Sequence, residues 1–318
     1  MKNILIVPPV ANKEFEQRTK KAAEGNNIRY LSPIDVKEED ISWANILIGN
    51  VAPGLLHGQE LEFCQLTSAG ADAYVKESVL NRNTVLSCCT GAYSQTVAEH
   101  ALAMTLMLIK DLHTYRDAQL RSEWIAGGAV GSINGATVII MGLGDIGCYY
   151  AKMAKALGAY VIGVKRRKTD KPEYIDELYT TDKFDEIACR GDIIFSVLPS
   201  TAETVHYYTR ERFEKMKPGA VFINCGRGTA VSADVLYEVL SENIITAAGI
   251  DVFETEPLPA ESPLWQLKNL VVTPHASGFF HLPSTITNVT DICVYNLDAW
   301  LNGKDLRNVV DYNTGYKK

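Results

Sequence analysis

Residues 137–147 read Thr-Val-Ile-Ile-Met-Gly-Leu-Gly-Asp-Ile-Gly, an apolar run that leads directly into three glycines spaced as GxGxxG. A helical pattern, 146–157, opens at the third glycine. Glycine triplets also occur in plain turns, but a strand before them and a helix after them are typical of a dinucleotide-binding loop. Free N–H groups and the positive end of the helix dipole would hold the pyrophosphate there. The segment predicts a dinucleotide site in a parallel α/β domain.

Short apolar runs alternate with longer mixed stretches on both sides of this segment, as in doubly wound α/β folds. Together with 137–141, the later strands are expected at 160–164, 192–198, 220–224, 246–251 and 270–273. Earlier strands are expected at 4–7, 28–31, 46–48, 63–66 and 84–87, with helices at 12–24 and 72–79. A long amphipathic helix over 94–120 is expected to act as a hinge, and a final helix over 282–301 is expected to return to the first domain.

Length and composition exclude several classes of protein. At roughly 150 residues per domain, the 318 residues predict two domains. The net charge of −7, with cations scattered along the chain, argues against a nucleic-acid partner. The start of the chain lacks a secretory signal, and the longest apolar run, 101–109, is far shorter than the ~20 residues of a membrane span. We therefore expect a cytoplasmic protein.

The seven cysteines predict neither a metal site nor a disulfide framework. Their spacing matches no zinc motif, and two adjacent cysteines, Cys88 and Cys89, are poorly placed to bridge each other. The positions are Cys64, Cys88, Cys89, Cys148, Cys189, Cys225 and Cys293. We expect reduced thiols and no bound metal.

The strand expected at 160–164 is followed by Lys165, Arg166, Arg167 and Lys168. An NAD site usually has an acidic residue here, which accepts hydrogen bonds from the adenosine ribose. Cations suit the 2′-phosphate of NADP instead. This charge run favours NADP, with NAD still possible, over the alternative of a solvated basic loop.

Three later segments each present one polar residue near the end of a strand: Arg227 between two glycines, Glu256 in Glu-Thr-Glu-Pro, and His275 in Thr-Pro-His. Ligands of doubly wound sheets bind outside the carboxyl ends of the strands, so these residues are expected to converge. An arginine clamps a carboxylate with two prongs, and a glutamate beside a histidine fixes the ring and favours its charged form. Together they predict a hydride-transfer site.

Each residue taken singly has a simpler interpretation: a surface arginine on a turn, a solvated glutamate, a hydrogen-bonded core histidine. Their common position after strands of one dinucleotide domain favours the catalytic interpretation. The remaining histidines lack such a setting and are interpreted as structural or surface residues, with His281 the one candidate for a place near the cleft: His57, His100, His113, His206 and His281.

Motifs along nearly the whole chain resemble those of the D-isomer-specific 2-hydroxyacid dehydrogenases. Besides the glycine motif, they are Leu-Thr-Ser-Ala-Gly-Ala-Asp at 66–72, Val-Ala-Glu-His-Ala-Leu at 97–102, Leu-Pro at 198–199, Asn-Cys-Gly-Arg-Gly at 224–228, Gly-Ile-Asp-Val-Phe at 249–253, Glu-Pro-Leu-Pro at 256–259, Ser-Pro-Leu-Trp at 262–265 and Thr-Pro-His at 273–275. The resemblance implies a homodimer and a Rossmann dinucleotide-binding domain, 96–283, inserted into a smaller flavodoxin-like substrate domain, 1–95 and 284–318.

The resemblance also implies roles for individual residues. Arg227 orients the carboxylate and carbonyl of the substrate, His275 is the acid/base, and Glu256 tunes His275. Substrate contacts are expected from Val51, Ser68, Ala69, Gly70, Arg227 and His275. Dinucleotide contacts are expected from Gly142, Gly144, Asp145, Ile146, Lys165, Arg166, Arg167, Leu198, Pro199, Thr204, Cys225, Arg227, Asp251, His275 and Gly278.

Two departures from the family pattern refine the expected activity. The cations after 160–164 resemble the NADPH-using glyoxylate and hydroxypyruvate reductases, and the chain has no extension for a regulatory domain like that of long phosphoglycerate dehydrogenases. We expect NADPH to reduce a small 2-keto acid to a D-2-hydroxy acid. One alternative is a dinucleotide-sensing binding protein, like the C-terminal-binding protein corepressors, without significant turnover. A formate dehydrogenase relative is another, although Gln rather than Glu256 is expected there.

Overall fold

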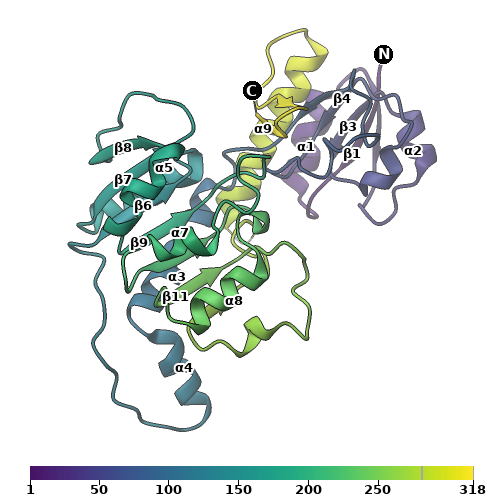
Figure 1. Cartoon of the computed structure of the whole chain (residues 1–318). Helices are drawn as coiled ribbons and strands as arrows, with labels where there is room; N and C mark the ends of the chain where they lie inside the picture. Colours follow the sequence, from purple (N-terminus) through teal and green to yellow (C-terminus); the bar gives the residue numbers. More distant parts are fainter. Residues whose placement is uncertain (281, 318) are drawn as a thin grey trace. The chain divides into compact units, whose positions relative to one another are not determined.

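The computed structural model describes residues 1–280 and 282–317, which divide into two compact units (Figure 1). Unit 1 comprises Met1–Tyr93 and Phe279–Lys318, and unit 2 comprises Ser94–Gly278. The chain therefore leaves unit 1, builds unit 2 and returns to unit 1. His281, the candidate for a place near the cleft, lies outside the described residues.

Unit 1 is built on a five-stranded parallel sheet of order β2-β1-β3-β4-β5, the order of flavodoxin-like folds. The strands are β1 (Asn3–Val7), β2 (Asn27–Tyr30), β3 (Ile46–Gly49), β4 (Phe63–Gln65) and β5 (Val85–Ser87). The helices are α1 (Lys13–Ala22), α2 (Glu38–Trp43), η1 (Pro53–Leu56) and α9 (Pro283–Leu301), and a hairpin of β13 (Val310–Asp311) and β14 (Tyr316–Lys317) follows. Strands buried on both faces explain the continuous apolar runs in the sequence.

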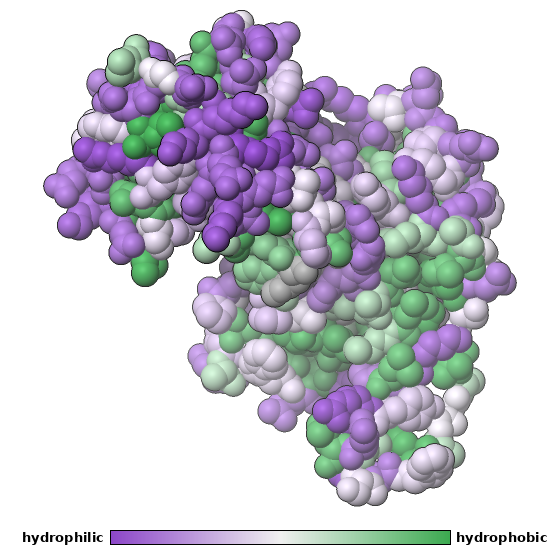
Figure 2. Space-filling model, turned by 180° about the vertical axis from the view of Figure 1, so that it is seen from behind, coloured by the Kyte–Doolittle hydropathy of each residue, from purple (hydrophilic) through white to green (hydrophobic). Residues whose placement is uncertain are grey.

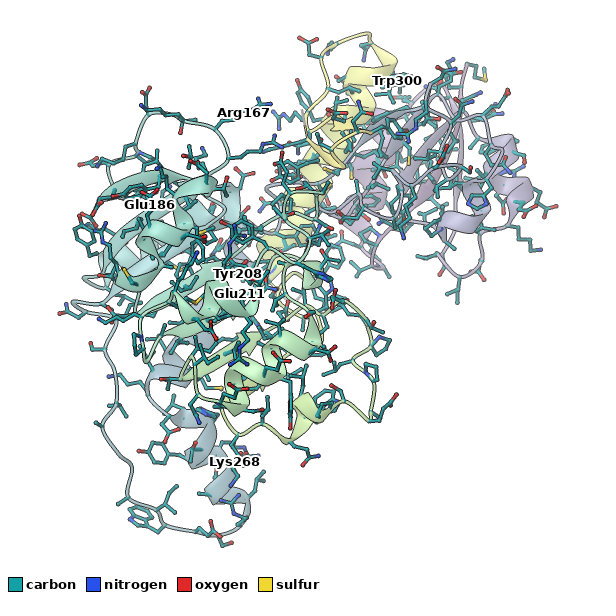
Figure 3. All side chains as sticks on the ribbon, in the orientation of Figure 1. Arg167, Glu186, Tyr208, Glu211, Lys268 and Trp300 are labelled. Carbon is teal, nitrogen blue, oxygen red and sulfur yellow. The ribbon has the colours of Figure 1, made fainter. Side chains whose placement is uncertain are left out.

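The last helix, α9, belongs to unit 1 and packs against α1 and β4. Trp300 on α9, labelled in Figure 3, stacks on Phe63 of β4 with ring centroids 5.0 Å apart. Asn296, fully buried on the same helix, donates to the Gln65 side chain at 2.6 Å. The helix thus covers the sheet although 195 residues, 88–282, lie between it and β5 in the sequence.

Unit 2 is built on a seven-stranded parallel sheet of order β12-β11-β10-β9-β6-β7-β8. The strands are β6 (Thr137–Met141), β7 (Tyr160–Lys165), β8 (Glu177–Thr180), β9 (Ile193–Ser196), β10 (Val221–Asn224), β11 (Ala247–Ile250) and β12 (Leu270–Val272). The helices are α3 (Ser94–Ile109), α4 (Leu112–Leu120), α5 (Asp145–Ala156), η2 (Thr181–Lys183), α6 (Phe184–Ile187), η3 (Ala188–Arg190), α7 (Arg210–Glu214), η4 (Gly228–Ala230), α8 (Ala233–Ser241) and η5 (Pro263–Gln266). The order of strands reverses between β6 and β9, which makes this a Rossmann sheet with its switch point there.

Every strand expected from the sequence is present, with ends that differ by two residues at most. The expected helix over 72–79 is wrong: this segment forms consecutive turns, and near its end Ser78 adopts a left-handed φ of +69, which a right-handed helix does not contain. The single helix over 94–120 is also wrong. Asp111, with φ +55, divides it into α3 and α4.

Several elements were missed by the sequence analysis, and β8 and α2 illustrate why. The edge strand β8 reads Glu-Leu-Tyr-Thr and has no apolar run, since its residues are only half-buried. The helix α2 has six residues, three of them acidic. Among the described residues, no helix is long and apolar enough to cross a membrane.

Candidate active site

The glycine motif forms the turn between β6 and α5. Gly142 has φ +104, and a Cβ there would lie 2.7 Å from the Val197 carbonyl oxygen, so glycine is required for this close turn. Gly144 is the N-cap of α5, and Asp145 and Ile146 begin its first turn. The N–H groups of that turn therefore open at the carboxyl edge of the sheet, beside the switch point. This arrangement fits a dinucleotide pyrophosphate.

The cations expected to meet a 2′-phosphate follow β7. Lys165 is its last residue and is half-buried, while Arg166 and Arg167 are exposed. In Figure 3 the side chain of Arg167 extends from this loop. Three cations at the end of the second strand of the sheet fit a doubly charged phosphate group by charge.

Three further residues expected at the dinucleotide site are buried in the loops after β9 and β10. Leu198 and Cys225 are buried, and the Thr204 hydroxyl accepts from the Thr201 amide and donates to the Pro199 carbonyl at 2.5 Å. Thr204 therefore shapes its own loop. Burial, and to a smaller extent the charge of Asp251, raises the pKa of the Cys225 thiol above its usual range. Cys225 thus lines this region as a neutral group.

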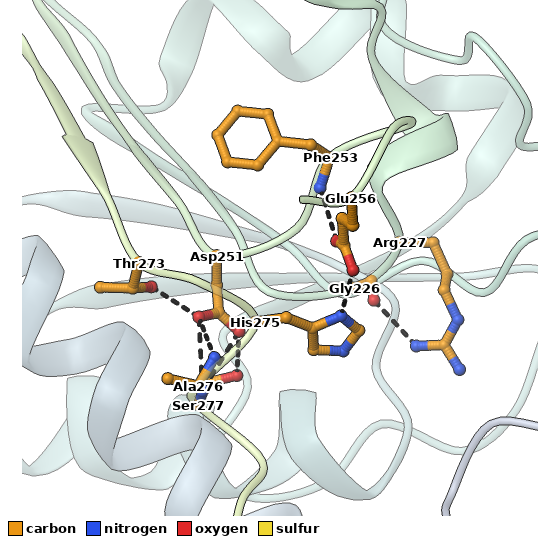
Figure 4. A network of polar contacts seen from close by, with 9 residues as sticks. All are labelled: Gly226, Arg227, Asp251, Phe253, Glu256, Thr273, His275, Ala276 and Ser277. Atoms are coloured by element: carbon orange, nitrogen blue, oxygen red, sulfur yellow. Dashed lines mark hydrogen bonds and ion pairs between the residues drawn. The ribbon is translucent and has the colours of Figure 1, made fainter. Parts of the chain in front are cut away.

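His275 and Glu256 lie together, as expected. The Nδ1 atom of His275 lies 2.8 Å from Oε2 of Glu256, and Oε1 of Glu256 accepts the Phe253 amide at 2.9 Å (Figure 4). Both oxygens of the carboxylate therefore have a partner. Because Nδ1 donates to Glu256, Nε2 is the nitrogen that can exchange a proton with a ligand.

Arg227 follows β10 on a turn packed closely against the loop of Glu256. A Cβ at Gly228 would lie 1.9 Å from the backbone carbon of Phe253, so the two segments touch through their main chains. The Arg227 carbonyl accepts from the Asn224 amide group at 3.1 Å, and its Nη1 donates to the Gly226 carbonyl at 2.9 Å. Figure 4 shows Arg227 in the same cluster as Glu256 and His275.

Asp251 organises the segment that carries His275. This carboxylate is fully buried and accepts from the hydroxyls of Thr273 and Ser277 at 2.5 Å, and from the Ala276 amide at 2.9 Å. The Asp251 carbonyl accepts the His275 amide at 2.8 Å. His275 itself has φ +53, and such a conformation persists only where surrounding contacts enforce it. Asp251 supplies those contacts.

Three members of this network were missed by the sequence analysis: Thr273, Ser277 and His100. Nε2 of His100, on α3, lies 3.1 Å from the Thr273 hydroxyl. Because that hydroxyl donates to Asp251, it accepts from His100. His100 was interpreted as a structural or surface residue, and no local pattern could link it to a threonine 173 residues later.

The residues expected to contact substrate from unit 1 lie after β3 and β4. The Asn50 side chain accepts from the Thr67 amide at 2.8 Å and donates to the Ser68 hydroxyl at 2.9 Å. The Ser68 hydroxyl in turn donates to the Gly70 carbonyl at 2.8 Å. Val51 is buried, and its carbonyl accepts from the Tyr74 hydroxyl. The loop of Ser68, Ala69 and Gly70 is therefore ordered by neutral side chains.

A family model described as "D-isomer specific 2-hydroxyacid dehydrogenase, NAD binding domain" matches residues 102–277. The chain belongs to the D-isomer specific 2-hydroxyacid dehydrogenase family. The matched segment contains the glycine turn, Arg227, Glu256 and His275. Membership makes this protein an NAD(P)-dependent oxidoreductase that uses a nicotinamide dinucleotide.

Relatives of this dehydrogenase family resemble most of the chain, and solved structures of the family resemble nearly all of it. Glyoxylate/hydroxypyruvate reductase B of Pectobacterium atrosepticum is 33% identical over 264 residues, which cover 81% of each chain. A family structure from Aeromonas salmonicida is 32% identical with a TM-score of 0.86, covering 98% of this chain and 99% of the other. An NADPH-dependent glyoxylate/hydroxypyruvate reductase from Sinorhizobium meliloti, solved with NADP and sulfate, is 26% identical with a TM-score of 0.85, covering 99% of this chain and 100% of the other. Because these relatives are reductases, the comparison does not favour the alternative of a corepressor-type binding protein.

Proposed function

We propose that this protein reduces a small 2-keto acid of the glyoxylate or hydroxypyruvate type to a D-2-hydroxy acid, with NADPH as the preferred cofactor. The observation that carries the proposal is the hydrogen bond from His275 Nδ1 to Glu256, because it leaves Nε2 available as a proton donor. Arg227 lies in the same cluster and supplies a planar cation for a carboxylate.

In this proposal the bound dinucleotide supplies the hydride to the keto carbon. Arg227 binds the carboxylate of the substrate through its guanidinium and stabilises the negative charge that develops on the ketone oxygen. His275 transfers a proton from Nε2 to that oxygen. Glu256 stabilises the imidazolium before transfer and keeps the ring oriented, and the Asp251 network positions the backbone of His275. In the reverse direction, His275 accepts the proton of the hydroxyl.

The cofactor preference rests on charge. Lys165, Arg166 and Arg167 replace the acidic residue that binds the ribose hydroxyls in NAD sites, and cations stabilise a 2′-phosphate. The S. meliloti reductase, of the same fold and 26% identical, is NADPH-dependent. We further propose, from the family resemblance, that the amides of Ala69 and Gly70 bind the substrate carboxylate.

We also propose that the enzyme is a cytoplasmic homodimer. On the face shown in Figure 2, unit 1 is mostly hydrophilic, whereas unit 2 presents broad hydrophobic areas. The segment from α4 to the start of β6 exposes several large apolar side chains, including a fully exposed Trp124. They are Leu112, Leu120, Trp124, Ile125 and Val130. Apolar surface of this kind favours burial against a second copy.

Steady-state kinetics with a panel of 2-keto acids and both reduced dinucleotides tests the proposal. We expect turnover of glyoxylate or hydroxypyruvate, a higher kcat/KM with NADPH than with NADH, and a D-configured product by enantioselective chromatography. Absence of turnover across the panel would overturn the function. A preference for NADH would overturn the cofactor assignment alone, and light scattering of the purified protein tests the dimer.

A further inference from the structure

A second histidine in unit 2 shares the unusual backbone of His275. His206, in the loop after β9, has φ +49, whereas most residues other than glycine avoid this left-handed region. Its imidazole also bonds to a glutamate: Nε2 donates to Oε1 of Glu254 at 2.5 Å. Glu254 and Glu256 belong to one short segment, so the imidazoles of His206 and His275 form hydrogen bonds to the same loop.

The main chain around His206 is joined to the turn of Arg227. The His206 amide donates to the Thr229 carbonyl at 2.7 Å, and the Tyr208 amide donates to the Ala230 carbonyl at 3.0 Å. The hydroxyls of Ser200 and Thr229 are also 3.0 Å apart. Thr229 and Ala230 belong to η4, which begins directly after Arg227. These contacts enforce the left-handed backbone of His206.

The side chain of His206 is joined to the loop of Glu256 instead. Glu254 follows Phe253, whose amide donates to Glu256 Oε1, while Glu256 Oε2 accepts from His275. The bond from His206 to Glu254 therefore restrains the segment that places Glu256. The side chain of His206 is 57% exposed, and an exposed ion pair contributes little to global stability. A left-handed backbone at His206 is energetically unfavourable, which indicates that the residue has a role in the local structure.

We propose that His206 is a positioning residue for the reductase reaction: its main chain supports the Arg227 turn, and its imidazole restrains Glu256 through Glu254. This inference rests on the proposed function of the same site. The two links are separable, because a side-chain substitution removes only the second. Loss of the imidazole should therefore lower kcat through Glu256 and leave KM for the keto acid, which depends on Arg227, nearly unchanged.

The test compares His206→Asn with His206→Gln. Asparagine tolerates the left-handed backbone but is too short to reach Glu254, whereas glutamine places an amide donor near the position of Nε2. We expect kcat to fall about tenfold in His206→Asn, since small misplacements of catalytic groups cost this much or more. KM should stay within about twofold, and His206→Gln should recover most of the rate. Hydrogen exchange of a peptide spanning Asp251–Glu256, measured by mass spectrometry, should quicken in His206→Asn only.

A matched control is Lys183→Gln, which breaks the exposed ion pair of Lys183 and Glu186 elsewhere in unit 2. It should change neither kcat nor exchange in the peptide. Should His206→Asn fail to fold, Glu254→Leu breaks the same bond from the other side. Unchanged kcat and exchange in the variant that folds, or a fall in Tm with kcat and KM altered together, would overturn the proposal. If the wild type reduces no keto acid, the proposed function fails, and hydrogen exchange still decides whether His206 restrains the Glu256 loop.

Discussion

The two units share a parallel sheet with helices on its faces, but different residues follow their strands. In unit 1 the segments after β3 and β4, residues 50–52 and 66–71, contain no charged residue, and Asn50 orders them through neutral hydrogen bonds. In unit 2 the loops after β7, β10, β11 and β12 carry cations, carboxylates and an imidazole. In the proposed function, the same architecture supplies backbone groups for substrate recognition in one sheet and acid/base chemistry in the other.

The largest expected loss of activity follows from substituting His275 in unit 2. Replacing it with Asn, which tolerates φ +53, removes the proton donor and keeps the backbone. We expect kcat for the keto acid to fall about 10²- to 10⁴-fold, the usual contribution of a general acid. The affinity for NADPH, measured by fluorescence titration, should change little.

His57→Asn is a matched control for the His275 variant, because it removes an exposed imidazole from unit 1. It should leave kcat and NADPH affinity as in the wild type. A His275→Asn protein whose kcat lies within threefold of wild type contradicts the placement of acid/base chemistry in unit 2.

The second largest effect is expected at Arg227. Lysine keeps the charge of Arg227 but loses the two-pronged geometry that matches a carboxylate. For Arg227→Lys we expect kcat/KM for the keto acid to fall about 10²-fold, in keeping with the strength of charge-assisted bonds. Steady-state kinetics measures it, and Arg190→Lys, at the edge of the same sheet, is the control. An equal fall in kcat/KM in Arg227→Lys and Arg190→Lys would contradict a specific role of Arg227 in binding the keto acid.

A smaller effect is expected in unit 1. Asn50→Ala removes the acceptor for the Thr67 amide and hydroxyl and the donor to Ser68, so the loop of Ser68 to Gly70 loses its order. We expect KM for the keto acid to rise about fivefold, the worth of about one hydrogen bond, while kcat stays within twofold. Asn83→Ala, an exposed asparagine of the same unit, is the control. A fall in kcat that exceeds the rise in KM would contradict the proposal that unit 1 contributes to substrate binding alone.

The features of the fold and of the candidate site that depend on local sequence could be predicted. Most of the strands are apolar runs, and Arg227, Glu256 and His275 each follow one of these, so topology alone implies that they converge. The Asp251 network could not be predicted, because the hydrogen bonds from Thr273 to Asp251 and from His100 to Thr273 join residues far apart in sequence. The helix break at Asp111 also could not be predicted, because a single left-handed residue does not change the periodicity of the apolar residues.

The smallest effect is expected at the edge of the unit 2 sheet, where charge serves stability. Hydrogen bonds from Arg190, and then from Tyr179 and Tyr160, lower the pKa of Glu177 on β8 from its usual 4.5 to about 2. Because the folded-state pKa is depressed, the stabilisation is complete above pH 4.5 and is lost as the pH falls towards 2.

Arg190→Gln removes the main cause of this shift. Urea unfolding should show wild type more stable than the variant by at most about 1 kcal/mol at pH 7, as for other exposed pairs. The difference should narrow steadily between pH 4.5 and pH 3, and kcat should stay unchanged, because β8 carries none of the reacting groups. A difference that stays constant or grows on acidification would show that Arg190 stabilises the edge strand by packing rather than through the Glu177 carboxylate.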